Sequence, residues 1–440
     1  MVDNMGVTFD FSKKKEIAIY KRIAEYTAAV PGFADELRED KNATLKKYGI
    51  INAELADKKA YDGFIKAKIN WRDEHKEACA PDNSRMKKWR ERQKGRCVLS
   101  FPDAAAGNVH IPIMYELSSG CSVGCEFCGV GAKGLQSVFR YNDENAKFFK
   151  DVLEVGKRVI GEASKHAALY FATEPLDNPD YEKFKNIFVD SLGQIPQITT
   201  SVPLRDIDRT KSLLSELDEN SNMFYRFSVR SLKDFYKIME SFTAEELLFV
   251  ELIPQFSEAP GNMFVRSGRN MEDDGIESSI SCITGFLINM CEKTVKLTTP
   301  VIASKEYPEG MAILLEEKFD TVEELEEILN KAISEKMKTI LEPDDKLSLY
   351  PWFEYMNSDG KTGIKAKNGA ELLVENSEVE VLYGHTVEAL KSGNYTRKEI
   401  GGLVSGKMGY LNPINVYSLI NKLWNMGVIY DDSIFGEGKE

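Results

Sequence analysis

Three cysteines lie close together in residues 120–129, which read Gly-Cys-Ser-Val-Gly-Cys-Glu-Phe-Cys-Gly. Three and then two residues separate them, on a glycine-rich loop that follows an apolar run. Thiolates at this spacing can ligate three corner irons of a 4Fe–4S cube. The fourth iron then lacks the protein ligand that four-cysteine electron-transfer sites provide. An iron with an open position can bind a small molecule, so the loop predicts a cluster with chemistry of its own.

Two other uses of clustered cysteines have less support. A zinc site needs a fourth ligand, usually from a second C-x2-C or an H-x3-H pair. The four histidines are scattered along the chain: His75, His110, His166 and His385. A disulfide framework is typical of small secreted chains, whereas this chain has 440 residues. The iron–sulfur cluster is therefore the favoured interpretation.

The C-x3-C-x2-C spacing resembles the signature of the radical S-adenosylmethionine (SAM) enzymes. This resemblance implies that Cys121, Cys125 and Cys128 hold one 4Fe–4S cluster and that the amine and carboxylate of SAM bind its open iron. It also implies an external electron donor, such as a flavodoxin or ferredoxin, whose electron cleaves SAM to a 5′-deoxyadenosyl radical. The hard chemistry then belongs to the cofactor. Phe127, directly before the third cysteine, matches the aromatic residue that family members often place near the adenine.

Composition limits the partners and the compartment. The net charge of −13 argues against nucleic acid or an anionic membrane as the main partner, because both attract basic surfaces. No apolar stretch approaches the length of a membrane span. The N-terminal residues contain the basic run 13–15 but no apolar core, so they do not resemble a signal peptide. Seven cysteines, an odd number, fit a reducing compartment, and we expect a cytoplasmic protein.

Residues 101–305 have the pattern of an α/β domain. Predicted strands alternate with helices, and the strands cover residues 109–117, 167–172, 197–202, 224–229, 247–253 and 295–302. Such alternation argues for a parallel sheet, here a partial (β/α)6 barrel of the TIM type. Barrel enzymes carry out their chemistry at the carboxyl ends of the strands. The cysteine loop follows the first strand, at that end.

Three further regions flank the barrel. Residues 1–100 form a predicted helical region, with helices at 15–30 and 33–45 and a basic helix at 86–93, interpreted as a solvated face or as the wall of a peptide channel. Residues 306–370 hold a charged helix and a linker. Residues 371–440 resemble the winged-helix elements with which radical enzymes recognise ribosomal precursor peptides. Within that region Thr396 and Glu399 form a capping-box pattern, and a plain helical cap on the barrel is the alternative interpretation.

Glu174 follows the second predicted strand. The segment 171–179 occupies the place of the family's Gly-Gly-Glu motif, with Ala172 and Thr173 in place of the two glycines. The resemblance implies that Glu174 pairs with the ammonium group of SAM by a charge-assisted hydrogen bond. The alternative is a carboxylate at a strand end that caps the next helix.

Other candidate SAM ligands follow later strands. Ser228 and Arg230, at the end of the fourth strand, match the place where the family often binds the SAM carboxylate. Thr200, at the end of the third strand, could donate a hydrogen bond. For each of these, an ordinary loop residue without a ligand is the alternative interpretation.

Cys282 and Cys291 lie outside the cysteine loop, on a predicted helix over residues 279–291. Nine residues are about 2.5 helical turns, so the two thiols are expected to face nearly opposite sides of that helix. They are therefore not predicted to ligate a second cluster together. Buried packing is the alternative role for both, since free cysteine is commonly a small buried hydrophobe.

Residues of roughly 30–305 resemble the radical SAM peptide epimerases, which mature ribosomally made peptides of the proteusin and Nif11-leader kinds. The segments that carry this resemblance are 86–93, the cysteine loop, 173–181, 282–286 and 297–300. In that family a radical removes a Cα hydrogen from an L-residue, and a cysteine thiol returns hydrogen from the opposite face to give the D-residue. The resemblance implies this isomerase reaction on the core of a leader-bearing precursor peptide. Cys282 is then the donor, and Cys291 is the second candidate.

Another radical SAM peptide modification, either backbone splicing or crosslinking, is the alternative. Many such enzymes carry extra C-terminal cysteines for auxiliary clusters, and residues 305–440 contain none. A non-catalytic iron–sulfur or zinc module that only binds a peptide is the alternative from outside this class.

Overall fold

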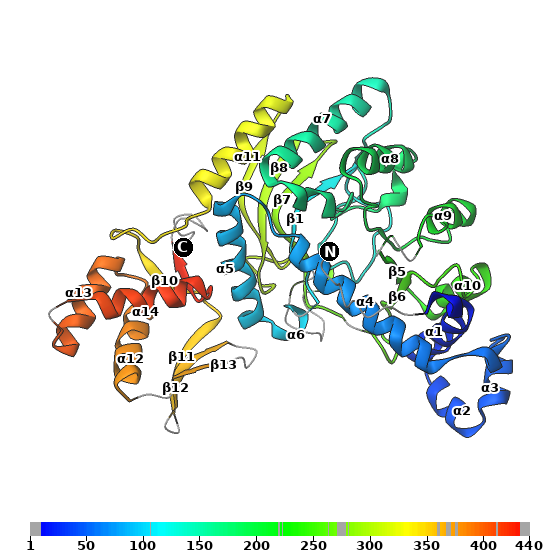
Figure 1. Ribbon diagram of the computed structural model, residues 1–440, viewed down its shortest axis with the longest axis horizontal. Helices are drawn as coiled ribbons and strands as arrows, with labels where there is room; N and C mark the ends of the chain where they lie inside the picture. Colours follow the sequence, from blue (N-terminus) through cyan, green and yellow to red (C-terminus); the bar gives the residue numbers. More distant parts are fainter. Residues whose placement is uncertain are drawn as a thin grey trace.

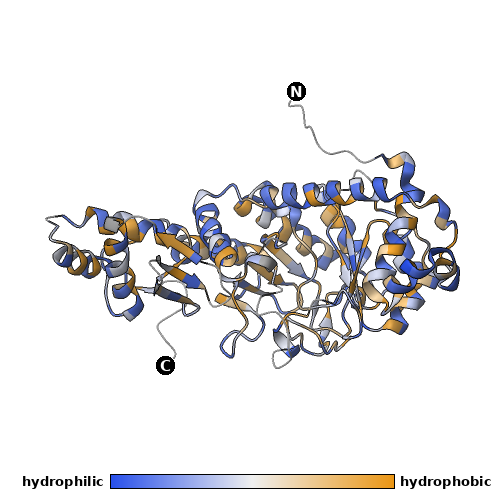
Figure 2. Ribbon diagram, turned by 90° about the horizontal axis from the view of Figure 1, so that it is seen from below, coloured by the Kyte–Doolittle hydropathy of each residue, from blue (hydrophilic) through white to orange (hydrophobic). Residues whose placement is uncertain are grey.

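The computed structural model describes residues 10–431, except for residues 106, 219–220, 222, 263, 271–278, 280, 359–360, 367–370, 375–376 and 411. The protein has a mixed α/β fold, as predicted, with strands in the middle and helices around them (Figure 1). The hydrophilic sides of the outer helices face away from the strands (Figure 2). Among the described helices, none combines the length and the apolar character needed to span a bilayer.

The parallel part of the barrel contains β1 (Ile111–Glu116), β4 (Thr199–Thr200), β5 (Tyr225–Val229) and β6 (Val250–Pro254). The last three form one sheet in the order β4-β5-β6. Residues 167–172, expected as the second strand, are an extended segment between β1 and β4. Tyr115 N donates to Ala168 O at 3.0 Å, but the Ala172 amide donates to the Glu116 carboxylate at 2.7 Å. That side-chain acceptor replaces a backbone partner, so no regular ladder forms here.

The helix predicted over 279–291 is wrong, because residues of this region form β7 (Ile283–Asn289). All seven residues of β7 are buried, and the run Ile-Thr-Gly-Phe-Leu-Ile-Asn is rich in the β-branched and aromatic residues that favour strands. β7 pairs in parallel with β1. At Gly285, whose φ is +153°, a Cβ atom would lie 1.9 Å from Pro112 O, so only glycine allows this close approach.

The barrel does not close. β7 continues into β8 (Thr294–Pro300) and β9 (Met311–Lys318), both antiparallel, in a sheet of order β1-β7-β8-β9. The predicted sixth parallel strand, 295–302, is therefore the antiparallel β8. Four residues separate β7 from β8, which suffices for a hairpin, whereas a parallel crossover needs a dozen or more residues.

Amphipathic helices cover the outside of the barrel. They confirm the predicted helices within a few residues and are α7 (Asp143–Ile160), α8 (Tyr181–Leu192), α9 (Ile207–Leu214), α10 (Leu232–Ser241) and α11 (Val322–Lys336). Their buried residues recur at helical spacing, as Phe149, Val152, Leu153 and Ile160 do on α7. Two short strands, β2 (Ser118–Ser119) and β3 (Ser137–Val138), pair antiparallel after the end of β1. Isolated 3-10 turns connect these elements: Phe11–Lys13, Ala53–Leu55, Glu162–His166, Pro175–Asp177 and Gly268–Asn270.

The N-terminal region is helical, as predicted. Its helices are α1 (Lys14–Ala29), α2 (Phe33–Glu39), α3 (Lys41–Lys47), α4 (Lys58–Ala78), α5 (Ser84–Ser100) and the short α6 (Pro102–Ala105). The single helix expected over 33–45 is broken at Asp40, whose carboxylate accepts the Ala43 amide at 3.0 Å and caps α3. α1 packs against β6 at the edge of the parallel sheet. α4 runs across the molecule as one long helix (Figure 1, Figure 2).

The basic segment predicted at 86–93 lies within α5 and has two faces: Lys87, Lys88 and Glu91 are exposed, as expected of a solvated face, and the other residues are buried. Trp89 is fully buried, and Arg90 is 2% exposed. The Arg90 guanidinium donates to Thr284 O at 2.9 Å and to Cys79 O at 2.5 Å. Arginine can satisfy several backbone carbonyls at once because its donors form a planar fork. α5 therefore fixes the start of β7 to the N-terminal helices.

The C-terminal elements lie beyond α5, at the left of Figure 1. They comprise β10 (Leu347–Leu349) paired with β14 (Ile429–Asp431), the antiparallel sheet β11 (Phe353–Ser358), β12 (Lys361–Ala366) and β13 (Glu371–Val374), and the helices α12 (Ser377–Ser392), α13 (Arg397–Met408) and α14 (Ile414–Asn425). Both halves of the predicted Thr396–Glu399 capping box are present. Strand pairing crosses two expected domain boundaries: β8 with β9 crosses 305/306, and β12 with β13 crosses 370/371.

Candidate cluster and cofactor site

The cysteine loop follows the carboxyl end of β1 and lies within the connection between β2 and β3. Cys121 forms a bridge with Gly134 on the far side of the loop, and its amide donates to Lys133 O at 2.9 Å. Gly120 has φ of +78°, and a Cβ atom there would lie 2.3 Å from Gly134 O. A side chain at position 120 would therefore push the two arms of the loop apart. Glycine is therefore required at position 120 for steric reasons.

Backbone amides point at two of the three sulfurs. Val123 N lies 3.5 Å from Cys121 Sγ, and Ala132 N lies 3.4 Å from Cys128 Sγ. Burial raises the pKa of Cys121 and of Cys125, while the Val123 amide and the Ser201 hydroxyl respectively act in the opposite direction. Hydrogen bonds to cysteine sulfur are one of the ways in which proteins stabilise and tune iron–sulfur clusters. The loop therefore directs hydrogen-bond donors at the sulfur atoms that would ligate a cluster.

Arg269 holds the loop from outside. Its guanidinium donates to Cys125 O at 2.8 Å and to Ala132 O, and its own amide donates to Cys128 O at 3.0 Å. The sequence analysis left this arginine unassigned, inside a long polar loop. The neighbouring Gly268 has φ of +59°, and a Cβ atom there would lie 2.3 Å from Cys128 O, so the backbone packs closely against the cysteine loop at this point.

A second clamp holds the other side of the loop. Asp177 accepts from Ser122 N at 2.7 Å and from the Arg205 guanidinium at 2.7 Å. Arg205 also donates to the Ser122 hydroxyl at 2.9 Å. Sequence reasoning assigned neither Asp177 nor Arg205. Asp177 lies within residues 171–179, three residues after Glu174, and this proximity in sequence could have identified it as a site residue.

The three thiols line one cavity of about 320 Å³ inside the barrel, which we name the cluster chamber. The predicted site residues that line it are Cys121, Cys125, Cys128, Phe127, Glu174, Ser228 and Cys282. Arg230, Thr200 and Cys291 lie outside it. The structure thus brings together seven of the ten predicted site residues.

Glu174 is 3% exposed and accepts two backbone hydrogen bonds, from Leu176 N at 3.1 Å and from Ser201 N at 2.9 Å. The first bond caps the turn Pro175–Asp177, as the alternative interpretation expected. Burial raises the pKa of Glu174, and the donors from Ser201, Thr200 and Leu176 oppose that shift. Each carboxylate oxygen has a further lone pair, so capping leaves Glu174 able to accept from a ligand in the cluster chamber.

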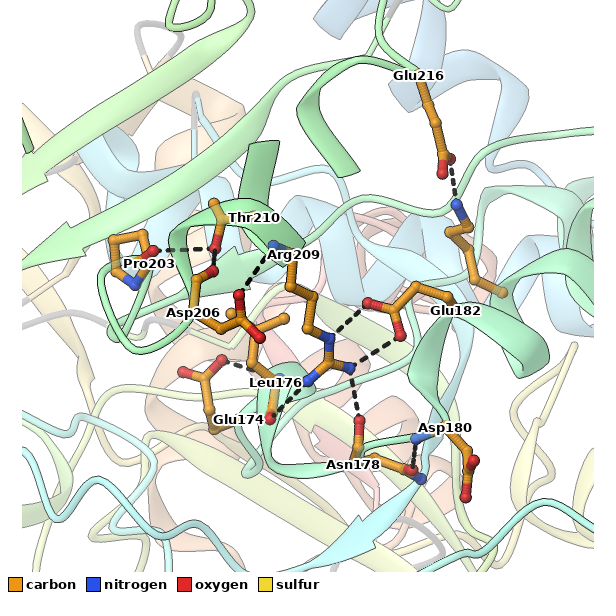
Figure 3. A network of polar contacts seen from close by, with 11 residues as sticks. Glu174, Leu176, Asn178, Asp180, Glu182, Pro203, Asp206, Arg209, Thr210 and Glu216 are labelled. Carbon is orange, nitrogen blue, oxygen red and sulfur yellow. Dashed lines mark hydrogen bonds and ion pairs between the residues drawn. The ribbon is translucent and has the colours of Figure 1, made fainter. Parts of the chain in front are cut away.

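Arg209 supports the Glu174 turn from behind (Figure 3). Its guanidinium donates to Leu176 O at 3.2 Å and to Asn178 O at 2.7 Å, and it forms a bidentate pair with Glu182. This network fixes the backbone that follows Pro175, whose Leu176 amide is bonded to the Glu174 carboxylate, and so supports the direction of that side chain.

Thr200 and Arg230 are close to the site but serve other partners. The Thr200 hydroxyl accepts from Val202 N at 3.0 Å and contacts Glu174, so it positions that carboxylate from outside the chamber. Arg230 pairs with Asp234 at 3.4 Å and lines two adjoining cavities of about 450 and 620 Å³. Its charge lowers the pKa of Cys125. Ser228 and Phe127 each line the cluster chamber and one of these neighbours.

Cys282 and Cys291 lie at opposite ends of β7, not on opposite faces of one helix. Cys282 O accepts from Ile111 N at 2.7 Å at the amino end of β1. Cys291 follows the carboxyl end of β7, where its amide donates to Asn289 Oδ1 at 3.0 Å and its thiol meets Ser137. Burial raises the pKa of both thiols, which keeps each as S–H at neutral pH. Cys282 alone of this pair faces the cluster chamber.

The residues present fit a cube with one open iron. Three thiols enter the chamber from consecutive turns of one loop, with amides directed at two sulfurs. In the described part of the chain, no three Cys, His, Asp or Glu side chains converge as ligands of a single ion. A cube does not require such convergence, because each of its corner irons takes one thiolate.

A curated relative is 30% identical to this chain over 363 residues, which cover 80% of this chain and 69% of the relative. It is the "Uncharacterized protein y4wI" of Sinorhizobium fredii. The chain belongs to the same family as this protein. No model of a protein family matches the chain. A crystal structure of BtrN in complex with AdoMet and 2-DOIA aligns with 42% of this chain and 72% of its own, at 13% identity and a TM-score of 0.30.

Proposed function

We propose that this chain is a radical SAM enzyme, with a 4Fe–4S cluster on Cys121, Cys125 and Cys128. The observation that carries the proposal is the cluster chamber, where three thiols and a buried carboxylate face one cavity at the carboxyl ends of the strands. When bound, the cluster and SAM supply a radical that can abstract hydrogen from a carbon atom. Every other requirement falls on the side chains around that cavity.

The cluster chamber and the two cavities lined by Arg230 offer a complementary group for each part of SAM. Glu174 accepts from the ammonium group by a charged hydrogen bond, for which its buried position is suitable. The Ser228 hydroxyl, with the Arg230 charge beside Cys125, meets the carboxylate. Phe127, at the boundary of two cavities, offers a flat face to the adenine. These groups hold the cofactor against the open side of the cluster loop.

For the reaction itself we propose epimerisation of residues in a ribosomal precursor peptide. The cysteine loop enters the chamber from the carboxyl ends of the strands, and Cys282 enters from the amino ends. A planar carbon radical held between them loses hydrogen toward one side and can receive it from the other. Because burial keeps Cys282 protonated, its S–H is ready to donate, provided the thiol is held in near-attack geometry.

The matched pair Cys282→Ala and Cys291→Ala tests this reaction, with anaerobically reconstituted enzyme, SAM, a reductant and the precursor peptide. Cys282→Ala should keep the cluster, cleave SAM and remove a Cα hydrogen, but it should make no D-residue. Cys291→Ala should epimerise like the wild type. In D2O the wild type should place one solvent-derived deuterium on each inverted Cα. An enzyme that needs neither cysteine, or whose product shows no mass shift in D2O, would instead be assigned to splicing or crosslinking.

We propose that residues 371–430, which contain α12–α14, bind the leader of the precursor. The winged-helix-like order of these elements, on a chain of net charge −13, favours a peptide over nucleic acid. Deletion of residues 371–430 should weaken leader binding in a calorimetric titration while uncoupled SAM cleavage continues. Undiminished affinity would place leader recognition on the N-terminal helices instead.

A further inference from the structure

A second cavity, of about 340 Å³, lies at the other end of the barrel, and we name it the floor chamber. Its position follows from which residues of each strand it touches. The floor chamber is lined by Ile111 of β1 and Glu251 of β6. The cluster chamber is lined by Met114 and Ile253, which lie further toward the carboxyl ends of the same two strands. The floor chamber is therefore at the amino ends of the strands. Residues of α4, among them Ile69, form its outer wall.

Cys282 forms part of the wall between the two chambers. Tyr170, Arg226 and Cys282 line both cavities. Burial raises the pKa of Cys282, and the Arg226 charge partly offsets that rise. The Tyr170 hydroxyl contacts Gln197 and lies 2.7 Å from the Thr199 hydroxyl, which fixes the ring beside Cys282. The thiol can thus be approached from either side.

The floor chamber is cationic, although the chain as a whole has a net charge of −13. Among the described residues, four cationic side chains line it, and the one carboxylate is Glu251. Glu251 is already paired, with Arg226 at 2.7 Å and with Lys68. The other two cations, Arg72 and Lys165, pair with Asp73 at 3.1 Å and with Glu162 at 3.5 Å, two carboxylates that do not line the cavity. A cavity with this balance attracts a small anion.

Two neutral histidines mark a polar place in this cavity. The rings of His75 and His166 meet edge to face with centroids 4.5 Å apart. Within the described residues, neither ring nitrogen of His166 has a hydrogen-bond partner, and both nitrogens are buried. Buried polar atoms normally have a partner from the protein, from water or from a ligand. The floor chamber therefore has an unmet hydrogen-bonding capacity next to its cationic side chains.

The proposed reaction, on which this inference rests, leaves Cys282 without its hydrogen while the peptide occupies the cluster chamber. We propose that the floor chamber admits a small anionic thiol, which restores the hydrogen of Cys282 from the side opposite the cluster. The S–H bond of the small thiol breaks, and the S–H bond of Cys282 forms. The small thiol leaves as its own sulfur radical, so one hydrogen atom is transferred and no other reductant is required in this step.

Alkylation of Cys282, followed by mass spectrometry, tests the route without any turnover. Anionic iodoacetate is compared with neutral iodoacetamide at mildly alkaline pH, because the ratio of the two rates cancels changes in folding or in the pKa of the thiol. Lys165→Glu should lower the iodoacetate-to-iodoacetamide ratio at Cys282 by about tenfold. Lys150→Glu, the same charge change on the exposed outer side of α7, should leave it unchanged. An equal ratio in all three proteins would overturn the anionic route.

A bulky substitution in the wall of the floor chamber tests whether reagents reach Cys282 through this cavity. With the cluster loaded and SAM bound, Ile69→Trp should slow both reagents at Cys282 and not at Cys291, whereas Ile69→Ala should not slow them. Protection of Cys282 by SAM together with no effect of Ile69→Trp would overturn the inference.

Turnover then separates this inference from the proposed function. 3-Mercaptopropionate should support several-fold more D-residues per enzyme than neutral 2-mercaptoethanol in the wild type, and the preference should vanish in Lys165→Glu. Epimerisation with no preference for 3-mercaptopropionate would overturn only the proposal that a small anionic thiol restores the hydrogen of Cys282. A complete absence of D-residues under all conditions would overturn the proposed function.

Discussion

The two ends of the barrel lumen are built in different ways. At the carboxyl end, the cluster loop is one continuous stretch of ten residues, whose glycines, amides and cysteines shape one another. At the amino end, the surroundings of Cys282 come from α4, β1, β5, β6 and the segment 165–170. The first end is specified by local spacing. The second exists only once β7 has paired with β1.

The largest expected effect is at the carboxyl end. Cys125→Ala removes one of the three thiolates, so we expect the loss of the cluster and of all SAM cleavage, measured as bound iron, visible absorbance and released 5′-deoxyadenosine. Cys291→Ala is the matched control, because that thiol lies outside the cluster chamber. Selective loss in Cys125→Ala, with unchanged alkylation of Cys282, would show that the two ends are independent. A functional cluster in Cys125→Ala would refute the ligand assignment.

A smaller effect is expected for the carboxylate in the same chamber. Glu174→Gln keeps the shape and an acceptor but loses the charge, and a hydrogen bond to a charged group is worth about 1.5–3 kcal/mol. SAM affinity should therefore fall by roughly 10- to 100-fold, with cluster content unchanged. Glu144→Gln, the same change at an exposed position at the start of α7, is the control and should leave SAM affinity unchanged. Equal affinities for wild type and Glu174→Gln would remove Glu174 from the SAM site.

The outer clamp of the cluster loop should matter less, because Arg269 is exposed. Arg269→Met loses the two guanidinium hydrogen bonds to Cys125 O and Ala132 O. We expect a chelator to remove iron several-fold faster than from the wild type, while Arg269→Lys, which keeps the charge but not the fork, should be intermediate. If Arg269→Met retains iron as well as the wild type, the loop needs no support from this side.

The same contrast explains what the sequence could predict. The cysteine loop and Glu174 could be predicted from the spacing of neighbouring residues. The helices α7, α8 and α10 could be predicted from hydrophobic periodicity, and their bounds agree with the structure to within a few residues. Residues 279–291 were misassigned because a short apolar run fits a buried strand as well as a helix. That one error placed Cys282 and Cys291 on a helix. As a result, neither the β7–β8 hairpin, which keeps the barrel open, nor the floor chamber was predicted. Arg269 and Arg226 could not be found, since their partners lie far away in the chain.

The smallest expected effect is a dependence of stability on pH that comes from the amino end. Burial lowers the pKa of His75 to about 4, with Arg226 adding to the shift. Burial also lowers the pKa of His166 to about 3, with His75 and Lys165 adding to it. The unfolded chain, with ordinary histidine pKa values near 6.5, therefore binds more protons than the folded chain between about pH 6.5 and pH 4. Stability is fully present above this window and is lost as the pH falls through it.

His166→Phe tests that origin. The variant removes one group that must stay neutral in the folded chain, so the slope of the unfolding free energy against pH in this window should decrease, by at most about 1.4 kcal/mol per pH unit. Phenylalanine also fills the same space beside the His75 ring without leaving buried nitrogens unpaired. Denaturant titrations at a series of pH values measure the slope. An unchanged slope in His166→Phe would mean that the acid sensitivity arises away from the floor chamber, and that its two rings are packing elements rather than a polar site.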